Sequence, residues 1–376
     1  MPGSGAARAK PTSPRGALSC MDKERIEVDR SAPGLRQRLR DFADDYLPGG
    51  NWLRLLLAAL GIYLLIVLLL GIVWSIAPDE FDVREYTASQ LPASDGEAVT
   101  GAVTTATLIG VVDTLLQKRG GFIYNDRLPP GLYLDNMPHW EYGVLIQARD
   151  LGRAMREVLS RSQSQSQEDP DLALGEPRLN FQTDSWLLPP SESEYRKGIG
   201  YFRDYLERLA DPEQPDAQFY ARADNLRDWL AMINSRLGSL SQRLSASVGR
   251  RRLNTDLAGD ASASQATSAP GELEVRTPWY EIDDVFYEAR GTAWALIHFL
   301  RAVELDFADV LENKNARVSL RQIIRELEAT QEPVWSPVIL NGSGFGVLAN
   351  HSLVMASYLS RANAAIIDLR DLLAQG

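Results

Sequence analysis

Three histidines are the first residues of this sequence that could perform chemistry. His139, which precedes Trp140, lies in an aromatic stretch, whereas His298 and His351 lie in stretches with a helical pattern. A zinc protease or a di-iron bundle needs Glu-x-x-His or His-x-x-x-His on one helix, because those spacings put both ligands on one face. None of the three histidines has such a partner. The sequence therefore predicts no metal site; packed or surface histidines are the favoured interpretation, and a site assembled through space is the alternative.

A glycine-rich turn at residues 341–346 is the second candidate. It reads Asn-Gly-Ser-Gly-Phe-Gly and precedes the helical pattern that contains His351. A glycine-rich turn that opens a helix can present backbone N–H groups to an anion. The turn lacks the Gly-Lys-Ser/Thr of a phosphate-binding loop, and no βαβ pattern surrounds it as a dinucleotide site requires. A loop between helices is the favoured interpretation, and an anion site is the alternative.

These features combine into one candidate ligand-binding site. Its residues are His139, Trp140, Gly342, Gly344, Gly346 and His351. No Gly-x-Ser-x-Gly nucleophile elbow is present. Glu281, Asp284 and Glu288 fall on one face of a predicted helix, and such acidic runs are usually solvated. We therefore identify no catalytic residue, expect no cofactor, and favour a protein that is not an enzyme.

The element that must position any such site is the uncharged stretch from Leu55 to Pro78. At 1.5 Å per residue it spans the hydrocarbon core of a bilayer, where only a helix satisfies its own backbone groups. Trp52 and Trp74 lie near its ends, where indole rings favour the membrane interface, and Arg54 can extend to the headgroups. A cleaved signal peptide is the alternative, but this apolar core is too long for one. We predict an uncleaved signal anchor over residues 52–77.

The charges on the two sides of this anchor differ. Before it lie Arg36, Arg38, Arg40 and Arg54, and after it lie Asp79, Glu80, Asp82 and Glu85 against Arg84 alone. The positive-inside rule then places the N-terminus in the cytoplasm and the larger C-terminal part outside it.

The overall charge limits the class of partner. The chain of 376 residues has a formal net charge of −11, and positions 55–376 carry 29 basic and 43 acidic residues. Such an acidic region argues against binding to nucleic acid, which requires a basic surface. The single cysteine, Cys20, excludes an internal disulfide.

Three stretches repeat apolar residues at spacings of three and four. They run from Phe219 to Leu244, from Ile282 to Val310 and from Leu348 to Leu373. A narrow apolar stripe of this kind indicates helices that pack nearly parallel to one another. A coiled-coil homodimer is one interpretation, but arginines flank the first stripe and would face one another in a parallel pair. We favour an intramolecular antiparallel bundle of these three helices with a shorter helix that contains Ile199.

The predicted fold class is all-α, with one N-terminal transmembrane helix followed by an extracytoplasmic bundle of long antiparallel helices. Composition predicts a disordered cytoplasmic tail over residues 1–50 and a stalk over 78–95. The all-α domain is predicted over residues 96–376, with flexible loops at about 160–190 and 250–276.

Three motifs resemble a known family. They read Trp-Ser-Ile-Ala-Pro-Asp-Glu-Phe-Asp at 74–82, Gly-Gly-Phe-Ile-Tyr-Asn-Asp-Arg-Leu-Pro-Pro-Gly at 120–131 and Trp-Glu-Tyr-Gly at 140–143. Over about residues 50–376 the chain is similar to the bacterial domain-of-unknown-function family 2333. The resemblance implies an uncharacterised single-pass inner-membrane protein of Gram-negative bacteria. In such a cell, the charge asymmetry described above places the C-terminal domain in the periplasm. It implies no catalytic residues.

The sequence thus leads to two functional hypotheses. The first is a protein-interaction or scaffold component of the cell envelope, whose partners are the lipid bilayer and another envelope protein, with no nucleic acid. The second is an envelope enzyme or ligand sensor that uses the aromatic loop at 121–143 and the glycine-rich loop at 341–346.

Overall fold

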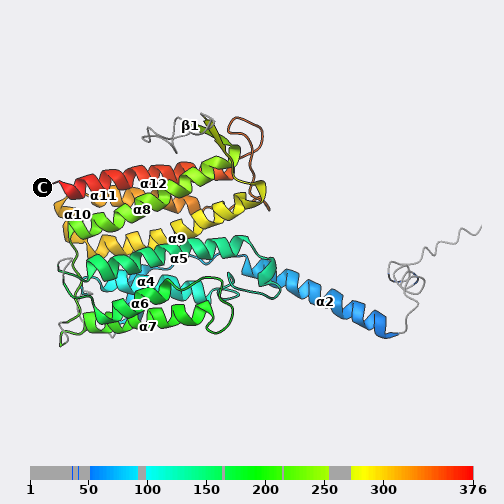
Figure 1. The fold of residues 1–376 in the computed structure, drawn as a ribbon, viewed down its shortest axis with the longest axis horizontal. Helices are drawn as coiled ribbons and strands as arrows, with labels where there is room; N and C mark the ends of the chain where they lie inside the picture. The colour runs from blue at the N-terminus through cyan, green and yellow to red at the C-terminus, as the bar shows by residue number, and fades with distance from the viewer. Residues whose placement is uncertain are drawn as a thin grey trace, which may run out of the picture. The chain divides into compact units, whose positions relative to one another are not determined.

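The computed structural model of the protein describes residues 36, 41, 51–91, 99–162, 166–213, 216–253 and 272–375. The tail predicted over residues 1–50, apart from two positions, and most of the loop predicted over 250–276 lie outside the described residues. The chain divides into two units, Met1–Tyr63 and Leu64–Gly376. The described part of the second unit is built almost entirely from helices (Figure 1), which confirms the predicted all-α class.

Helix α2, Asn51–Trp74, covers most of the anchor predicted over residues 52–77, but it ends three residues earlier than predicted. Its 23 residues from Trp52 to Trp74 form a continuous apolar helix, about 34 Å long at 1.5 Å per residue. Leucine and isoleucine side chains are exposed on all sides of it, among them Leu55, Ile62 and Leu68. Within the described residues, α2 is the one helix long and apolar enough to cross a bilayer.

Helices α3 to α7 form one group within residues 64–376 (Figure 1). Their bounds are Val83–Gln90 for α3, Ala102–Gln117 for α4, Asn136–Ala154 for α5, Pro170–Leu179 for α6 and Ser191–Ala210 for α7. Helix α6 packs along α7, and α4 contacts α3, α5 and α7. A π-helical turn, η2 at Met155–Leu159, continues α5, and a 3-10 turn, η1 at Gly131–Tyr133, precedes it.

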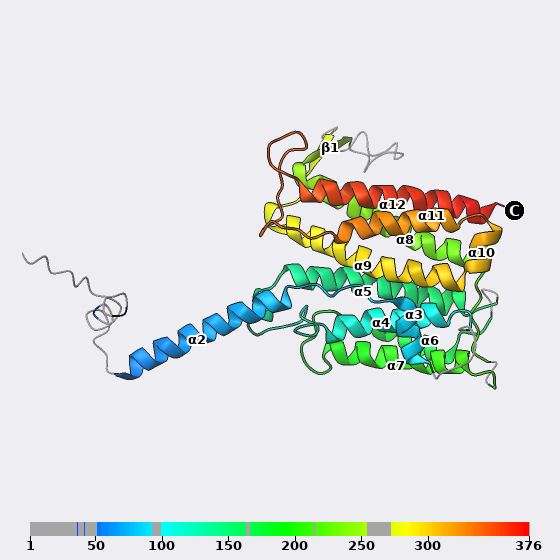
Figure 2. The ribbon, with the colours of Figure 1, turned by 180° about the vertical axis from the view of Figure 1, so that it is seen from behind.

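A second group contains the three helices with heptad-like spacing. The bounds are Ala223–Ser245 for α8, Ile282–Asp306 for α9, Ala308–Asn313 for α10, Arg317–Glu328 for α11 and His351–Ala374 for α12. Helix α12 packs antiparallel to α8 and beside α11 (Figure 2). The predicted stripes are buried inside the chain, for example at Leu230, Leu300 and Ile366.

Short elements complete this group. The 3-10 turns are η3 at Ala246–Val248, η5 at Trp279–Glu281 and η6 at Ala329–Gln331. Strands β1, Arg250–Leu253, and β2, Glu272–Val275, pair antiparallel with Arg250 opposite Val275.

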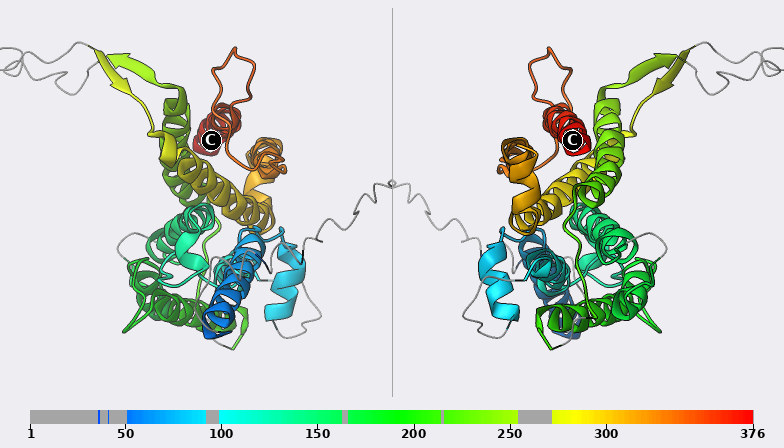
Figure 3. Two further views of the ribbon diagram at one scale, coloured as in Figure 1. Left: turned by 90° about the vertical axis from the view of Figure 1, so that its right-hand side faces the viewer. Right: turned by 90° about the vertical axis from the view of Figure 1, so that its left-hand side faces the viewer.

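Helices α5 and α9 join the two groups, which Figure 3 shows end-on. They run parallel, because His139 lies beside Asp284 and Gly143 beside Thr292. Two glycines allow their backbones to approach closely. A Cβ atom at Gly291 would lie 2.8 Å from the carbonyl carbon of Trp140, and one at Gly143 would lie 2.8 Å from the backbone nitrogen of Thr292. Any side chain at these positions would therefore push the two helices apart.

Three sequence-based expectations differ from this architecture. Helix α7, which contains Ile199, packs on α4 and α6 rather than on the three long helices. Helix α6 lies inside the loop expected at 160–190. Its apolar pattern is short, but Asp169 caps its N-terminus and Pro170 is its first residue, and both favour a helix start. Helix α3 lies inside the expected stalk, where Asp82 accepts the N–H groups of its first turn.

The start of α4 is stabilised by a distant residue. Its N-cap, Gly101, has no side chain that could accept a hydrogen bond. Asp306, at the end of α9, accepts the Gly101 N–H at 2.9 Å and the Thr104 N–H at 2.6 Å. A carboxylate at a helix N-terminus also opposes the positive end of the helix dipole. This contact fixes α4 against α9.

Candidate functional site

The histidine predicted as a site residue at position 139 lies at the start of α5. Its Nε2 is 3.3 Å from a carboxylate oxygen of Asp284, and both side chains are partly exposed. Burial raises the pKa of Asp284, and the charge of His139 opposes that rise. Trp140 instead points into the core, where its ring lies 5.2 Å from that of Trp294. Trp140 therefore acts as a packing residue between α5 and α9.

The glycine-rich loop is closed at its base by hydrogen bonds. The Gly342 N–H donates to the carbonyl of Ala349 at 3.0 Å, and the Asn350 side chain donates to the carbonyl of Gly342 at 2.7 Å. The Gly346 N–H donates to Ser343 at 2.8 Å. Two of the N–H groups that an anion would need are thus already used within the loop. Asn350 also caps α12 by accepting the Leu353 N–H.

His351 and His139 face different surroundings. The Nδ1 of His351 accepts the Leu340 N–H at 3.2 Å, and its ring lies 6.4 Å from that of Phe286. His139 contacts Asp284, two residues earlier on α9. Two residues on a helix are about 200° apart, so these contacts lie on opposite sides of α9. The structure therefore does not bring the predicted site residues into one pocket.

The acidic run on α9 is not simply solvated. Glu288 forms a two-pronged ion pair with Arg243 of α8, with N–O distances of 2.8 and 2.7 Å. Asp284 pairs with His139 as described. The prediction that this face is solvated is therefore wrong for these two residues, because α5 and α8 pack on that side of α9.

A buried ion pair lies where the anchor meets the helical domain. Lys118, just after α4, and Glu141 of α5 are 2.6 Å apart, and both side chains are buried. Glu141 also accepts the N–H groups of Ile123 and Tyr124, at 2.9 and 2.8 Å. Lys118 donates to the carbonyl of Gly121 at 2.6 Å. This ion pair therefore holds the turn at residues 120–124 in a fixed conformation.

Burial dominates the titration of Glu141. Loss of solvent raises its pKa to about 7, and this effect is opposed by the charge of Lys118 and by the backbone donors. The three donors, Lys118 and the N–H groups of Ile123 and Tyr124, stabilise the carboxylate and limit this rise in pKa.

The end of α2 packs directly on this fixed turn. A Cβ atom at Gly120 would lie 2.6 Å from the ring of Trp74, and Gly120 has a φ of 87° that favours glycine. One turn earlier on α2, Gly71 lies against Pro130 and Leu134. A Cβ atom at Gly71 would be 3.8 Å from the side chain of each. The predicted anchor residue Trp74 is thus partly covered by the domain.

His298 forms a second contact between the anchor end and the domain. Its Nε2 accepts the Phe81 N–H at 3.1 Å, and its Nδ1 lies 2.7 Å from the Trp294 carbonyl. Since an N–H can only donate, Nε2 carries no proton and Nδ1 donates to Trp294. Burial lowers the pKa of His298 to about 4, which keeps the ring neutral. The Phe81 ring also stacks on it at 4.2 Å.

Glu80 adds an ion pair beside this histidine. It lies 2.7 Å from Arg301, which also pairs with Glu328 of α11 at 2.7 Å. The segment after α2 is therefore tied to both α9 and α11. We call the contacts of Trp74, Phe81, Glu80 and the turn at 120–124 the anchor junction.

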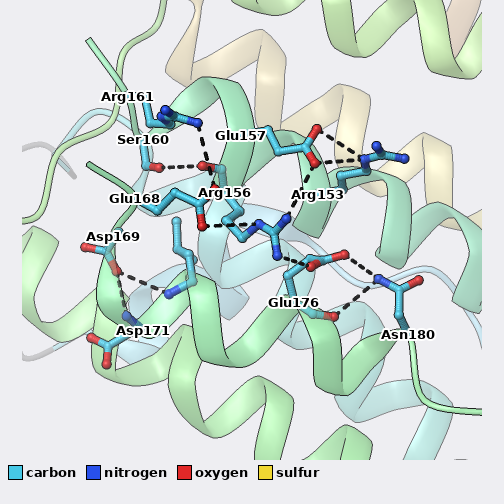
Figure 4. A network of polar contacts seen from close by, with 11 residues as sticks. Arg153, Arg156, Glu157, Ser160, Arg161, Glu168, Asp169, Asp171, Glu176 and Asn180 are labelled. Atoms are coloured by element: carbon cyan, nitrogen blue, oxygen red, sulfur yellow. Dashed lines mark hydrogen bonds and ion pairs between the residues drawn. The ribbon is translucent and has the colours of Figure 1, made fainter. Parts of the chain in front are cut away.

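A charged cleft of about 490 Å³ lies elsewhere, between α5, α6 and α8. Figure 4 shows part of its wall, where Arg153 contacts Glu157 and Arg156 contacts Glu176 at 2.7 Å. Arg236 of α8 closes another side through Asp150 at 2.9 Å. An anionic ligand would have to compete with these carboxylates, so the arginines act first as links between the helices.

The π-helical turn η2 shapes this cleft. It contributes Arg156 and Glu157 to the wall. A π turn widens the helix locally and commonly occurs at functional sites. Among the described residues, no group of three or more histidines, cysteines or acidic residues is placed to hold a metal ion.

The fold and the anchor junction define a class of protein in which one apolar helix is followed by an all-α domain. The chain belongs to DUF2333, a family of uncharacterised proteins conserved in bacteria, whose sequence pattern matches residues 48–376. No curated protein and no solved structure shows a significant match to the chain.

Trp74 was predicted as an anchor residue, but the residues that it meets at the anchor junction were not predicted as site residues. Glu141 and Gly120 lie inside two of the motifs that carry the family resemblance, which was the available signal. His298 was predicted to be either packed or on the surface, and it is fully buried because α9 is covered on all sides along this part of its length.

Proposed function

We propose that the protein is a membrane-anchored interaction protein of the bacterial envelope, with α2 in the inner membrane and the helical domain in the periplasm. The observation that carries the proposal is the anchor junction. An apolar helix of 23 residues ends in contacts that fix its last turn to the domain core. A domain held this way has a defined orientation relative to the membrane, which suits a scaffold.

The segment at 333–350 supports the interaction role. It contains no charged residue in 18 positions, and Trp335, Phe345 and Val347 are almost fully exposed. The hydrogen bonds of Asn350 and Gly342 hold the base of this loop. Exposed apolar side chains on a fixed loop are typical of protein–protein contacts, because little conformational entropy is lost on binding.

The orientation follows from the charges that flank α2. The arginines before it favour the cytoplasmic side, whereas Arg84 is the single basic residue among positions 75–95 after it. Alkaline phosphatase fused after Gly376 should be active, and a reporter that works only in the cytoplasm should be silent at the same position. The reverse result would place the domain in the cytoplasm and refute the proposal.

The partner is tested by photo-crosslinking in intact cells. A benzophenone amino acid at Phe345 should give a discrete adduct with another protein. The same group at Val318, an exposed position at the start of α11, is the matched control and should give none. Adducts with lipid only, or equal adducts at both positions, would contradict a protein partner at this loop.

A further inference from the structure

Two exposed loops lie beside the end of α2. Within residues 64–376, Pro130 and Leu134 contact Gly71, three residues before Trp74. Three residues correspond to about 4.5 Å along the helix. If Trp74 lies at the membrane interface, the loop that contains Pro130 and Leu134 lies either at the same depth or slightly deeper in the membrane. Lipid must then surround whatever that loop exposes.

The first loop exposes apolar side chains at that depth. The sequence from 128 to 134 reads Leu-Pro-Pro-Gly-Leu-Tyr-Leu and contains no charge. Leu128 is 65% exposed, Leu132 is 52% exposed and Tyr133 is 71% exposed. Exposure of these apolar side chains to water is energetically unfavourable. At the boundary between headgroups and acyl chains, leucine and tyrosine are both favoured.

The second loop is joined by a hydrogen bond to the segment just before the first loop. Asn125 donates from its side chain to the carbonyl of Ser185 at 2.6 Å. The sequence from 185 to 190 reads Ser-Trp-Leu-Leu-Pro-Pro and is also uncharged. Trp186, Leu187 and Leu188 are exposed, and Leu188 is 93% exposed. Figure 1 shows this loop, between α6 and α7, at the same end of the domain as the end of α2.

We infer that the loops at 128–134 and 186–188 form a second membrane contact, in which their apolar side chains enter the interface of the bilayer that α2 crosses. The inference rests on the proposed anchor, because α2 sets the depth of the first loop. The occupant is lipid rather than protein because this apolar surface is continuous with the anchor helix through Gly71. The contact would prevent the domain from tilting about the end of α2.

The chain allows a clean test because Cys20 is its single cysteine. In a Cys20→Ser background, a cysteine is placed at Leu132, Leu188, Leu68 or Val318 and labelled with an environment-sensitive fluorophore. The full chain is reconstituted in vesicles of phosphatidylethanolamine and phosphatidylglycerol. Quenching is then measured with lipids that carry a nitroxide near the headgroup or on the acyl chain.

The positions differ in what they test. Leu68 lies within α2 and reports on the proposed anchor. Val318, which is 75% exposed, is the second residue of α11 and is the control for an exposed apolar site. Helix α10, which directly precedes α11, lies at the end of the domain away from the end of α2 (Figure 1). All positions other than Leu68 are surface positions of the domain, so their substitution should leave the fold intact, and the thermal melt of each variant verifies this.

The inference predicts that labels at Leu132 and Leu188 emit at shorter wavelength and are quenched by the headgroup nitroxide, while the label at Val318 is not. If Leu68 is quenched but Leu132 and Leu188 are not, the second membrane contact is refuted and the anchor stands. If the loop labels are shielded from water without quenching, protein covers them and the inference is equally refuted. If Leu68 itself is not quenched, the proposed anchor fails first.

Discussion

The close approach of α5 and α9 leads to a sharp prediction at Gly291. In a Gly291→Ala variant the added Cβ would lie 2.8 Å from the carbonyl carbon of Trp140, and closer still to its oxygen. An ordinary contact begins near 3.4 Å, so the shortfall to the carbon alone is 3.4 − 2.8 = 0.6 Å. The obstacle is backbone rather than a flexible side chain, so the two helices must separate.

The net effect follows from two opposing contributions. Alanine in place of glycine favours the helix by roughly 1 kcal/mol. Overpacking against a backbone costs about 3 kcal/mol, at the upper end of the usual range, because the contact between Trp140 and Trp294 opens as well. We expect Gly291→Ala to lower the free energy of unfolding by about 2 kcal/mol.

Gly200 of α7 is the matched control. A Cβ there meets no atom within 4 Å, so Gly200→Ala should stabilise the chain by up to about 1 kcal/mol. The assay is denaturant unfolding of the full chain in detergent, followed by tryptophan fluorescence. Equal stability of the two variants would refute the close packing of α5 on α9.

Three further predictions concern buried polar groups. The pKa of His298 is about 4 in the folded chain, below its value of about 6.5 in the unfolded chain. The buried ring therefore contributes fully to the stability of the fold above pH 6.5. As the pH falls from 6.5 to 4, the free energy of unfolding should decrease by up to about 3 kcal/mol. A His298→Gln variant should lack that part of the pH dependence of unfolding, and parallel pH profiles would contradict the assignment. Glu141→Gln leaves the Lys118 ammonium buried without its counter-charge and should cost about 3–5 kcal/mol, whereas the double variant with Lys118→Met should recover most of that loss in denaturant unfolding. Asp306→Ala leaves the N–H groups at the start of α4 without an acceptor and should cost about 1–3 kcal/mol, with faster amide exchange there; unchanged exchange would exclude the capping role.

The positions of the long helices could be predicted because their apolar residues recur at a helical period. Helix α2 was predicted instead from its continuous apolar run, which forms one helix from Trp52 to Trp74. Helices α3, of 8 residues, and α6, of 10 residues, were missed. Helices of about two to three turns have too few residues to show a clear apolar period, and these two depend on capping by Asp82 and Asp169.

The candidate site could not be predicted in the same way. A glycine, a histidine or an aromatic residue is recognised in the sequence by type, but its partners decide its role. Trp140 was expected to contact a ligand, and its position against Trp294 makes it a core residue. Lys118 and Glu141 are 23 positions apart, and nothing in their spacing indicates a buried ion pair.

The sequence by itself determined the helical class, the apolar helix α2 with its asymmetric flanking charges, and which face of each long helix is buried. The tertiary structure alone decided which helices pair, why Gly143 and Gly291 are needed, and how Phe81 and Trp74 fix the end of α2 to the domain. The physical reason is that periodicity records how apolar a face is, but apolar attraction has no direction and does not specify a partner. The partner is selected by shape and by buried hydrogen bonds, such as that from Phe81 to His298, which join residues 217 positions apart.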